Sequence, residues 1–215
     1  MYRHFKYVCF VAVATLLAGC ATQKTQYDFS KFHSENPQSI LVIPAINDSI
    51  DVDAPDYLLS TISVPLAEKG YYVFPVNTVK TVLENEGLYD ANLVHSSDPV
   101  LLGDMFGADS ILYLRVNEWD AQYMVISTTV TVSFDYRLVS AKTGEELWSA
   151  EKTMQYSPSQ SNSGDPMVDL ISMAVSAVVT RAAPNYMPLT RQANHQVFYL
   201  DQTKLPEGAY KIKDN

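Results

Sequence analysis

The residues best suited to chemistry include four aspartates within nine positions of one another: Asp48, Asp51, Asp53 and Asp56. Clustered carboxylates can hold Ca²⁺, a hard cation that takes roughly six to eight oxygen ligands. The EF-hand spacing also needs a glycine at its sixth position and a glutamate at its twelfth, and neither is present. The simpler interpretation is that these carboxylates cap the next helix and stabilise the positive end of its dipole. We expect no metal in this loop, with a cation site as the open alternative.

Three histidines outside the first twenty residues are the other candidates for metal or acid–base chemistry: His33, His95 and His195. None has a second histidine, a cysteine or a carboxylate at a metal-ligand spacing such as H-E-x-x-H. We expect all three to be solvated, with His95 in a polar loop and His195 in a C-terminal tail. The sequence also has no G-x-S-x-G motif and no glycine-rich phosphate loop. We therefore expect no catalytic residue, no bound metal and no cofactor.

The two cysteines indicate a reaction with lipid instead of a disulfide. Residues 7–17 form an uncharged apolar stretch after a short basic start, shorter than the roughly 20 residues that span a bilayer. The stretch has the length and flanks of a secretory signal peptide, here residues 1–19. Cys9 lies inside this segment, so its removal leaves Cys20 as an unpaired cysteine at the first position.

The residues before Cys20, Leu17-Ala18-Gly19, resemble the bacterial lipobox. The resemblance implies cleavage between Gly19 and Cys20, a thioether from the thiol to diacylglycerol, and acylation of the new amino terminus, for example by palmitate. Several acyl chains hold a protein on a membrane far more firmly than one. Since Ala21 follows instead of aspartate, the same resemblance implies sorting to the periplasmic face of the outer membrane. An ordinary signal peptide with an incidental cysteine is the alternative.

The charge of the processed chain disfavours nucleic acid as a partner. Removal of residues 1–19 takes away two basic and no acidic residues, which leaves 13 basic against 24 acidic side chains and a formal net charge of −11. Such a surface repels phosphate backbones and anionic headgroups. About 195 residues remain, enough for one compact domain.

The first half of the chain has the pattern of an α/β domain. Apolar runs predict strands over 39–44, 71–76 and 111–116, separated by helices over 53–70, 77–87 and 98–107. We expect Asn77 to cap the second helix and Pro65 to kink or split the first. The order β-α-β-α-α-β requires crossovers, so part of the sheet should be parallel.

The second half changes to an antiparallel pattern. Residues 129–138 alternate between apolar and polar, which predicts a strand with one wet face, and Gly144 marks a hairpin turn to a strand over 147–154. A last, largely apolar helix is expected over 165–183, buried against the sheet or against a partner subunit. We therefore divide the chain into a signal peptide (1–19), a lipidated solvated tether (20–38), an α/β periplasmic domain (39–189) and a C-terminal tail (190–215).

Three stretches carry a resemblance to a known family: PLAEKGYYVFPV over 65–76, MFGADSILY over 105–113, and residues from Tyr123 to the TGEELW of 143–148. Together with the lipobox they resemble the bacterial lipoproteins grouped as the domain of unknown function DUF799. The resemblance implies a fold similar to the N-terminal domain of TolB. It also implies a place in an envelope assembly beside a lipoprotein similar to CsgG, and it carries over no catalytic or binding residues.

The leading functional hypothesis is a non-enzymatic structural or interaction subunit of a cell-envelope assembly, with a homo-oligomer left open. The alternative is a module that binds peptidoglycan or a small ligand through loops at the carboxyl ends of the parallel strands. A hydrolase with an unfamiliar site would need a cleft holding several ionisable groups with perturbed pKa values.

Overall fold

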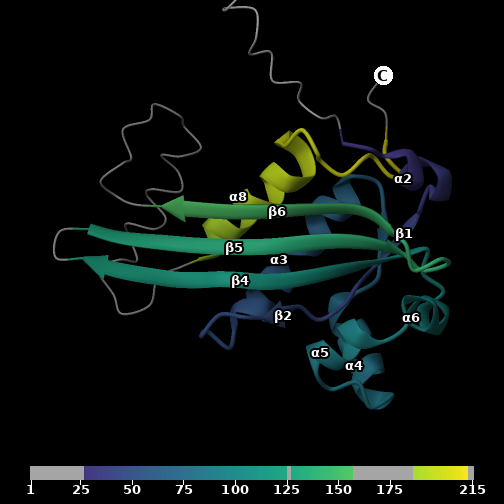
Figure 1. Ribbon diagram of the computed structural model, residues 1–215, viewed down its shortest axis with the longest axis horizontal. Coiled ribbons are helices and arrows are strands. Elements are labelled where there is room, and N and C mark those ends of the chain that lie inside the picture. Colours follow the sequence, from purple (N-terminus) through teal and green to yellow (C-terminus); the bar gives the residue numbers. More distant parts are fainter. Residues whose placement is uncertain (1–26, 125–126, 157–185, 213–215) are drawn as a thin grey trace, which may run out of the picture.

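The computed structural model describes residues 27–124, 127–156 and 186–212, and these residues form a mixed six-stranded sheet with helices around it (Figure 1). The α/β fold class with both parallel and antiparallel pairing is therefore confirmed. The strands run in the order β3-β1-β4-β5-β6, and β2 also pairs with β4. Their bounds are β1 (Ser39–Val42), β2 (Ile46–Asn47), β3 (Tyr72–Val73), β4 (Ser110–Met124), β5 (Ser127–Ser140) and β6 (Glu146–Tyr156).

The sheet has a parallel half and an antiparallel half. β1 lies parallel to both β3 and β4, as the crossover connections require, and β2 continues the parallel pairing with β4 beyond the end of β1. β4, β5 and β6 are antiparallel and much longer. Gly144 has a φ of +71° in the β5–β6 turn, the left-handed conformation that the hairpin prediction assigned to it.

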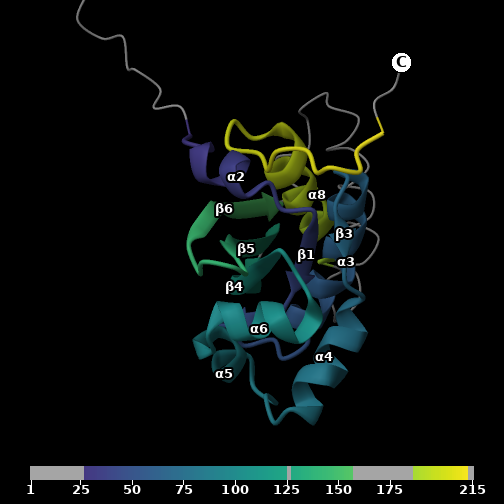
Figure 2. The same cartoon turned by 90° about the vertical axis from the view of Figure 1, so that its right-hand side faces the viewer.

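The helices cover the two faces of the sheet unequally (Figure 2). On one face, helices α3 (Ala54–Glu68) and α8 (Met187–His195) and the π-helix η2 (Gln196–Leu200) pack on the long strands and build the main core. On the other face, helices α4 (Val76–Asn85), α5 (Ala91–Ser96) and α6 (Pro99–Phe106) cover only the end where β1 and β4 begin, in a smaller core. The rest of this second face has no described helix over it (Figures 1 and 2).

The local signals for helix ends were mostly correct. Asp98 caps α6 by accepting the N–H of Val100 at 2.9 Å, and Gly107 ends that helix with a φ of +67°. Of the kink or split expected at Pro65, the split is wrong: α3 continues through Pro65, which lies in the last turn of the helix, so that few residues follow the interruption. The expected cap at Asn77 is also wrong, since α4 begins one residue earlier with Pro75 at its N-cap.

Five elements were not predicted: β2 and α5 within the expected domain, α2 in the expected tether, and α8 and η2 at the start of the expected tail. Several bounds also differ. β2 and α5 are absent from the expected order because each is too short to show a period, while β4 continues eight residues past the expected end at Val116. A bulge between Val116 and Glu118 lets that strand bend along its length. The expected helix over 165–183 lies outside the described residues, as do the signal peptide and Cys20.

Both ends of the described chain pack on the domain. Helix α2 (Ser30–Glu35) brings Phe32 into the main core, and the Tyr27 hydroxyl accepts the Ser149 N–H of β6 at 2.8 Å. At the other end, Phe198 is fully buried against Trp148, with ring centroids 6.1 Å apart. Segments that the sequence divided into tether and tail thus contribute side chains to the main core.

Candidate functional site

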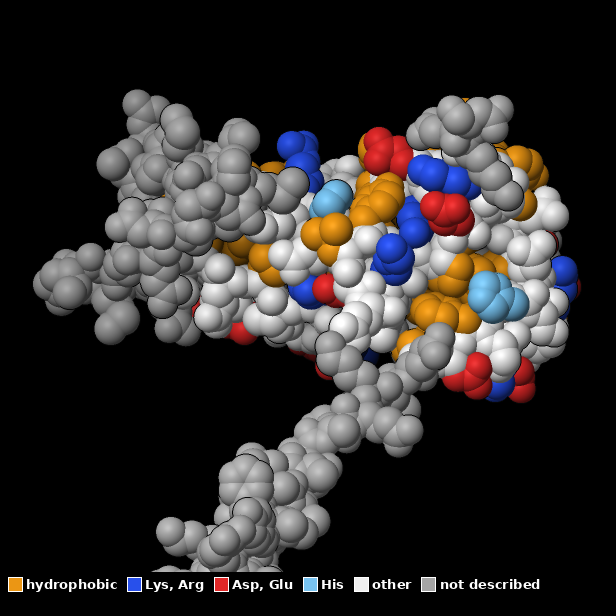
Figure 3. All heavy atoms as spheres, turned by 90° about the horizontal axis from the view of Figure 1, so that it is seen from above, with side chains coloured by type: hydrophobic (Ala, Val, Ile, Leu, Met, Phe, Trp, Pro, Cys, Tyr) orange, Lys and Arg blue, Asp and Glu red, His pale blue; other side chains and the backbone are white. Residues whose placement is uncertain are grey.

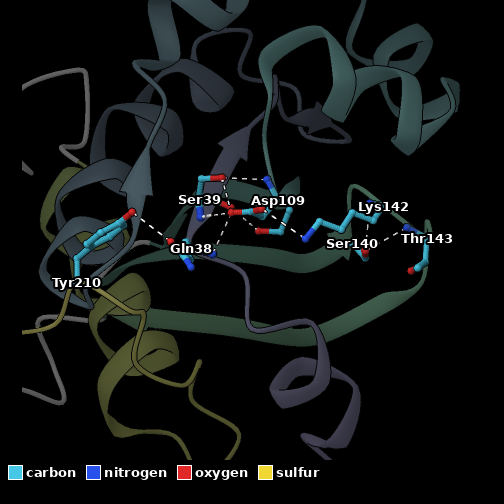
Figure 4. A network of polar contacts seen from close by, with 8 residues as sticks. Gln38, Ser39, Asp109, Ser140, Lys142, Thr143 and Tyr210 are labelled. Atoms are coloured by element: carbon cyan, nitrogen blue, oxygen red, sulfur yellow. Dashed lines mark hydrogen bonds and ion pairs between the residues drawn. The ribbon is translucent and has the colours of Figure 1, made fainter.

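A network of polar contacts joins the starts of β1 and β4 (Figure 4). The Asp109 carboxylate accepts the backbone N–H groups of Gln38 and Ser39, each at 3.1 Å, and the Ser39 hydroxyl at 3.0 Å. The Ser39 oxygen in turn accepts the Asp109 N–H at 2.9 Å. Lys142 of the β5–β6 turn lies 3.7 Å from the same carboxylate.

This network fixes the strand register and does not activate a nucleophile. The Ser39 side chain is largely buried, and its hydroxyl is held by Asp109 both as donor and as acceptor, so a substrate has little access to it. The Ser39 hydroxyl therefore positions the two strands.

An S-x-x-K sequence, the spacing of some serine nucleophiles and their lysine bases, runs from Ser149 to Lys152 on β6. Residues three apart on a strand point to opposite faces, and Lys152 pairs with Asp201 at 3.0 Å, so the two side chains do not act together.

A pocket with more groups that could bind a ligand lies beyond the carboxyl end of β1, on the face that the described helices leave partly open. It has a volume of about 260 Å³, and its lining combines α5, β4 and β5. His95 forms one wall and is tied to the end of β1, because its Nε2 lies 2.9 Å from the Pro44 carbonyl oxygen. The lining residues are His95, Tyr113, Leu114, Arg115, Asp135 and Arg137.

Tyr113 lies at the centre of the aromatic and cationic contacts of this pocket. The His95 ring meets it edge-on, with centroids 5.1 Å apart, and the Arg137 guanidinium lies over its face, 4.6 Å from the ring centroid. The Tyr113 side chain is 4% exposed, and its hydroxyl has no hydrogen-bond partner among the described residues. Burial raises the pKa of Tyr113, so the hydroxyl stays protonated at neutral pH.

His95 is uncharged in this environment. Burial lowers its pKa below the ordinary 6.5; the hydrogen bond to Pro44 opposes that shift, and the nearby charges of Arg115 and Arg137 add to it. The Nε2 atom must carry the proton, because its partner is a carbonyl oxygen. Nδ1 is then an acceptor. The expectation of a solvated loop histidine is therefore wrong, because His95 is a half-buried residue of helix α5.

The charged groups of the pocket differ in how far they are already paired. Arg115 forms an ion pair with Asp48, Nη1 to Oδ2, at 2.6 Å. Asp135 accepts the Asn117 side-chain amide at 2.6 Å and makes no ion pair with a described cation. Arg137 is exposed and makes no ion pair with a described carboxylate. Asp135 and Arg137, both on β5, are thus a carboxylate and a cation that make no ion pair with any described residue.

The pocket opens onto a wider polar surface of β5 and β6, which we call the open sheet face. A second hollow on this face, of about 550 Å³, shares Asp135 and Arg137 with the first. Between the two strands, the Ser133 and Thr153 hydroxyls are 2.8 Å apart. Register places Ser149, Glu151 and Thr153 of β6 on the same side as Asp135 and Arg137, where side chains alternate with those of the core.

The acidic loop does not act as a unit in the described structure. Asp48 pairs with Arg115, and Asp56 lies 3.7 Å from Lys80. Asp53 occupies the N-cap of α3 but makes no capping hydrogen bond with its side chain; the Asp51 carboxylate accepts the Asp53 N–H instead. Across residues 27–124, 127–156 and 186–212, no group of three or more His, Cys, Asp or Glu side chains could hold a metal ion.

The other histidines lie apart from the pocket. His33 is exposed on α2, as expected. His195 is half-buried at the end of α8, stacked on Tyr199 with centroids 5.1 Å apart, so the expectation that it is solvated in a free tail is wrong.

Sequence reasoning did not select Arg115 or Arg137. The period-2 pattern over 129–138 places Arg137 on the wet face, and an arginine there was the available signal.

These features define a class of protein: an α/β domain with the described N-terminal and C-terminal segments packed on its core, a half-open sheet and a small polar pocket. No described helix has the length and apolar character needed to cross a bilayer. Residues 27–205 match the family model described as "Putative lipoprotein GNA1162-like". The chain belongs to this family of lipoproteins, and the resemblance to the DUF799 lipoproteins is thereby confirmed at the level of family.

Two relatives from Neisseria meningitidis support the assignment. The chain is 37% identical over 174 residues to "Putative lipoprotein NMB1124/NMB1162" of serogroup B, which covers 80% of this chain and 79% of that protein. It is also similar to the crystal structure of lipoprotein GNA1162, with 39% identity, a TM-score of 0.56, and coverage of 67% of this chain and 96% of that one. A PelC dodecamer from Paraburkholderia phytofirmans is more distant, with 18% identity, a TM-score of 0.40, and coverage of 71% and 88%.

Proposed function

We propose that the chain is cleaved between Gly19 and Cys20, lipidated on Cys20, and held at the periplasmic face of the outer membrane. Membership of a lipoprotein family and the lipobox-like Leu17-Ala18-Gly19 support this. Seven residue steps separate Cys20 from Tyr27, the first described residue, which contacts the core. At about 3.6 Å per step, the domain lies within roughly 25 Å of its anchor.

The surface near the described ends is compatible with this placement. The described N-terminal segment with α2 and the described C-terminal segment lie on the same side of the domain (Figures 1 and 2). Figure 3 looks onto this side, where hydrophobic side chains lie among Lys, Arg, Asp and Glu side chains. Tyr210 and Ile212 are 62% and 81% exposed. We propose that this side faces the bilayer.

We further propose that the domain is a non-enzymatic interaction subunit of an envelope assembly. The observation that carries this proposal is the open sheet face, which displays a free cation, free carboxylates and paired hydroxyls with no described helix over them. A sheet with one packed and one wet face is stable without a partner, yet its flat polar side gives a partner regularly spaced donors and acceptors. The family resemblance makes a CsgG-like lipoprotein the first partner to test, and a second copy of this chain the next.

Photo-crosslinking in intact envelopes tests the interaction proposal. A photoreactive residue replaces Thr153, which is exposed on the open sheet face, in the lipidated protein. The matched control replaces Thr78, which is exposed on α4 at a distance from that face. We expect Thr153 to give a crosslinked product of defined mass, identified by mass spectrometry, and Thr78 to give none. Recovery of monomer alone from several positions of the face contradicts the proposal.

A ligand-binding module is the second candidate, and the pocket beside His95 favours it. The pocket lies next to the carboxyl end of β1, which is where open α/β sheets generally bind their ligands. Peptidoglycan is the polymer within reach of a short anchor at the outer membrane. Co-sedimentation with purified sacculi tests peptidoglycan binding, and the protein should pellet with the sacculi. If as much protein stays in solution as in a control without sacculi, the peptidoglycan hypothesis is excluded.

A further inference from the structure

The pocket beside His95 is lined by hydrogen-bond donors and by acceptors. Arg137 supplies N–H donors with no described ion-pair partner, and its guanidinium is held in place by the Tyr113 ring. An arginine stacked in this way loses little further freedom when a planar carboxylate accepts two parallel N–H groups from one edge of its guanidinium. A carboxylate is therefore the group that Arg137 is best prepared to bind.

Asp135 and His95 supply the acceptors of the pocket. One oxygen of Asp135 accepts the Asn117 amide, which leaves the other able to accept from a ligand. His95 presents Nδ1 as an acceptor, because Nε2 donates to Pro44. Since Asp135 and Arg137 are two residues apart on the same strand face, their side chains start about 7 Å from each other. That spacing is wider than a single ion pair and separates the charges of a bound molecule.

A buried group gives independent support for a ligand here. The Tyr113 side chain lines the pocket at 4% exposure, and its hydroxyl has no partner among the described residues. An unpaired buried hydroxyl is destabilising, and a polar ligand atom that reaches it removes the cost. The volume of about 260 Å³ lies below the range of roughly 300 Å³ and above that holds drug-sized ligands, so the ligand is small or is the end of a longer one.

We propose that this pocket binds a short peptide that carries a free carboxylate and a nearby ammonium group, with Arg137 contacting the carboxylate and Asp135 the ammonium. A simple phosphate or other anion fits less well, because Asp135 and Asp48 cancel the two arginine charges. The inference rests on the ligand-binding candidate above and is independent of the assembly proposal. It adds the chemical class of the ligand and the residue that contacts each charge.

Isothermal titration of the full lipidated protein in detergent tests the proposal with four probes. Alanyl-alanine, in L,L and D,D forms, carries both charges; alanyl-alanine amide lacks the carboxylate, and N-acetyl-alanyl-alanine lacks the ammonium. We expect the zwitterion to bind with a Kd of about 1 mM or tighter. Loss of either charge should weaken binding by about tenfold, the factor for one charge-assisted hydrogen bond.

Variants assign the two contacts. R137Q should lose affinity for the zwitterion and for the N-acetyl probe, and D135N should lose affinity for the zwitterion and for the amide probe. The matched control is R191Q, an exposed arginine on α8 that also makes no ion pair with a described carboxylate. Thermal melting verifies that each variant is folded. The proposal is overturned if no probe binds at 10-fold the expected Kd, or if R137Q binds as tightly as the wild type. Neither result affects the crosslinking test.

Discussion

A buried chain of hydrogen bonds joins the C-terminal helix to the sheet and to α3, and its disruption is the most quantitative prediction for the fold. The Asn194 side chain accepts the Tyr136 hydroxyl at 2.7 Å and donates to the Thr61 hydroxyl at 2.8 Å, which itself donates to the Leu58 carbonyl at 2.7 Å. All three side chains are buried. Burial raises the pKa of Tyr136 far above its ordinary value, so it remains a donor.

The magnitude follows from which groups are left without partners. Asn194→Leu keeps most of the side-chain volume but leaves the Tyr136 hydroxyl without a hydrogen-bond partner, which costs about 1–3 kcal/mol of stability. It also removes the hydrogen bond to Thr61, which costs about 1 kcal/mol. Thr61 still donates to Leu58, so it adds little more. We expect Asn194→Leu to lower the free energy of unfolding by about 2–4 kcal/mol. Tyr136→Phe alone leaves the Asn194 side-chain oxygen without a donor, which costs about 1–3 kcal/mol of stability.

The double variant measures whether Tyr136 and Asn194 are coupled in their effect on the free energy of unfolding. With both polar partners removed, Tyr136→Phe with Asn194→Leu should be more stable than Asn194→Leu alone, or at least cost less than the sum of the two single changes. Urea unfolding followed by tryptophan fluorescence measures each variant, since Trp119 and Trp148 are both buried. Asn77→Ala on exposed α4 is the control and should change stability by less than about 0.5 kcal/mol. Strictly additive costs in the double variant would refute the reasoning.

Two further predictions concern acidity and close packing. Because the folded-state pKa of His95 lies below the unfolded value of 6.5, the unfolded chain binds more protons near that pH, and stability should fall as pH drops below about 6.5. The urea midpoint between pH 7.5 and 5.5 should change less in His95→Gln than in the wild type or in the exposed control His33→Gln; equal slopes would contradict this. A Cβ at Gly208 would lie 2.4 Å from the Gly70 carbonyl oxygen, so Gly208→Ala should cost about 1–3 kcal/mol by thermal melting, and an unchanged melting temperature would argue against the close approach.

Sequence reasoning was most reliable where the determining residues are neighbours in the chain. Asp98 and Gly107 mark both ends of α6 because capping and positive φ are local properties. The strand alternation over 129–138 and the turn at Gly144 are local in the same sense. Pro65 misled because the effect of a proline depends on whether it lies in the middle or the last turn of a helix.

The packed ends and the pocket could not be predicted because their causes are distant in sequence. Phe32 lies among polar residues along the chain, and Phe198 lies in a short apolar run with no clear period. Contacts with the main core, and for Phe198 with Trp148 of β6, bury them. The pocket combines His95 of α5 with Tyr113 of β4 and Arg137 of β5. Each is unremarkable within its own segment, and only the strand order β1-β4-β5 brings them together.

The most direct test of the central claim is the location of the Cys20→Ala protein. Membrane fractionation and labelling with radioactive palmitate are compared between the wild type and Cys20→Ala, with Cys9→Ala as the matched control. If Cys20 is the anchor, the wild type and Cys9→Ala should be labelled and should sediment with the outer membrane. Cys20→Ala should be unlabelled and absent from the outer-membrane fraction. Outer-membrane sedimentation of Cys20→Ala equal to that of the wild type would contradict the proposed anchor.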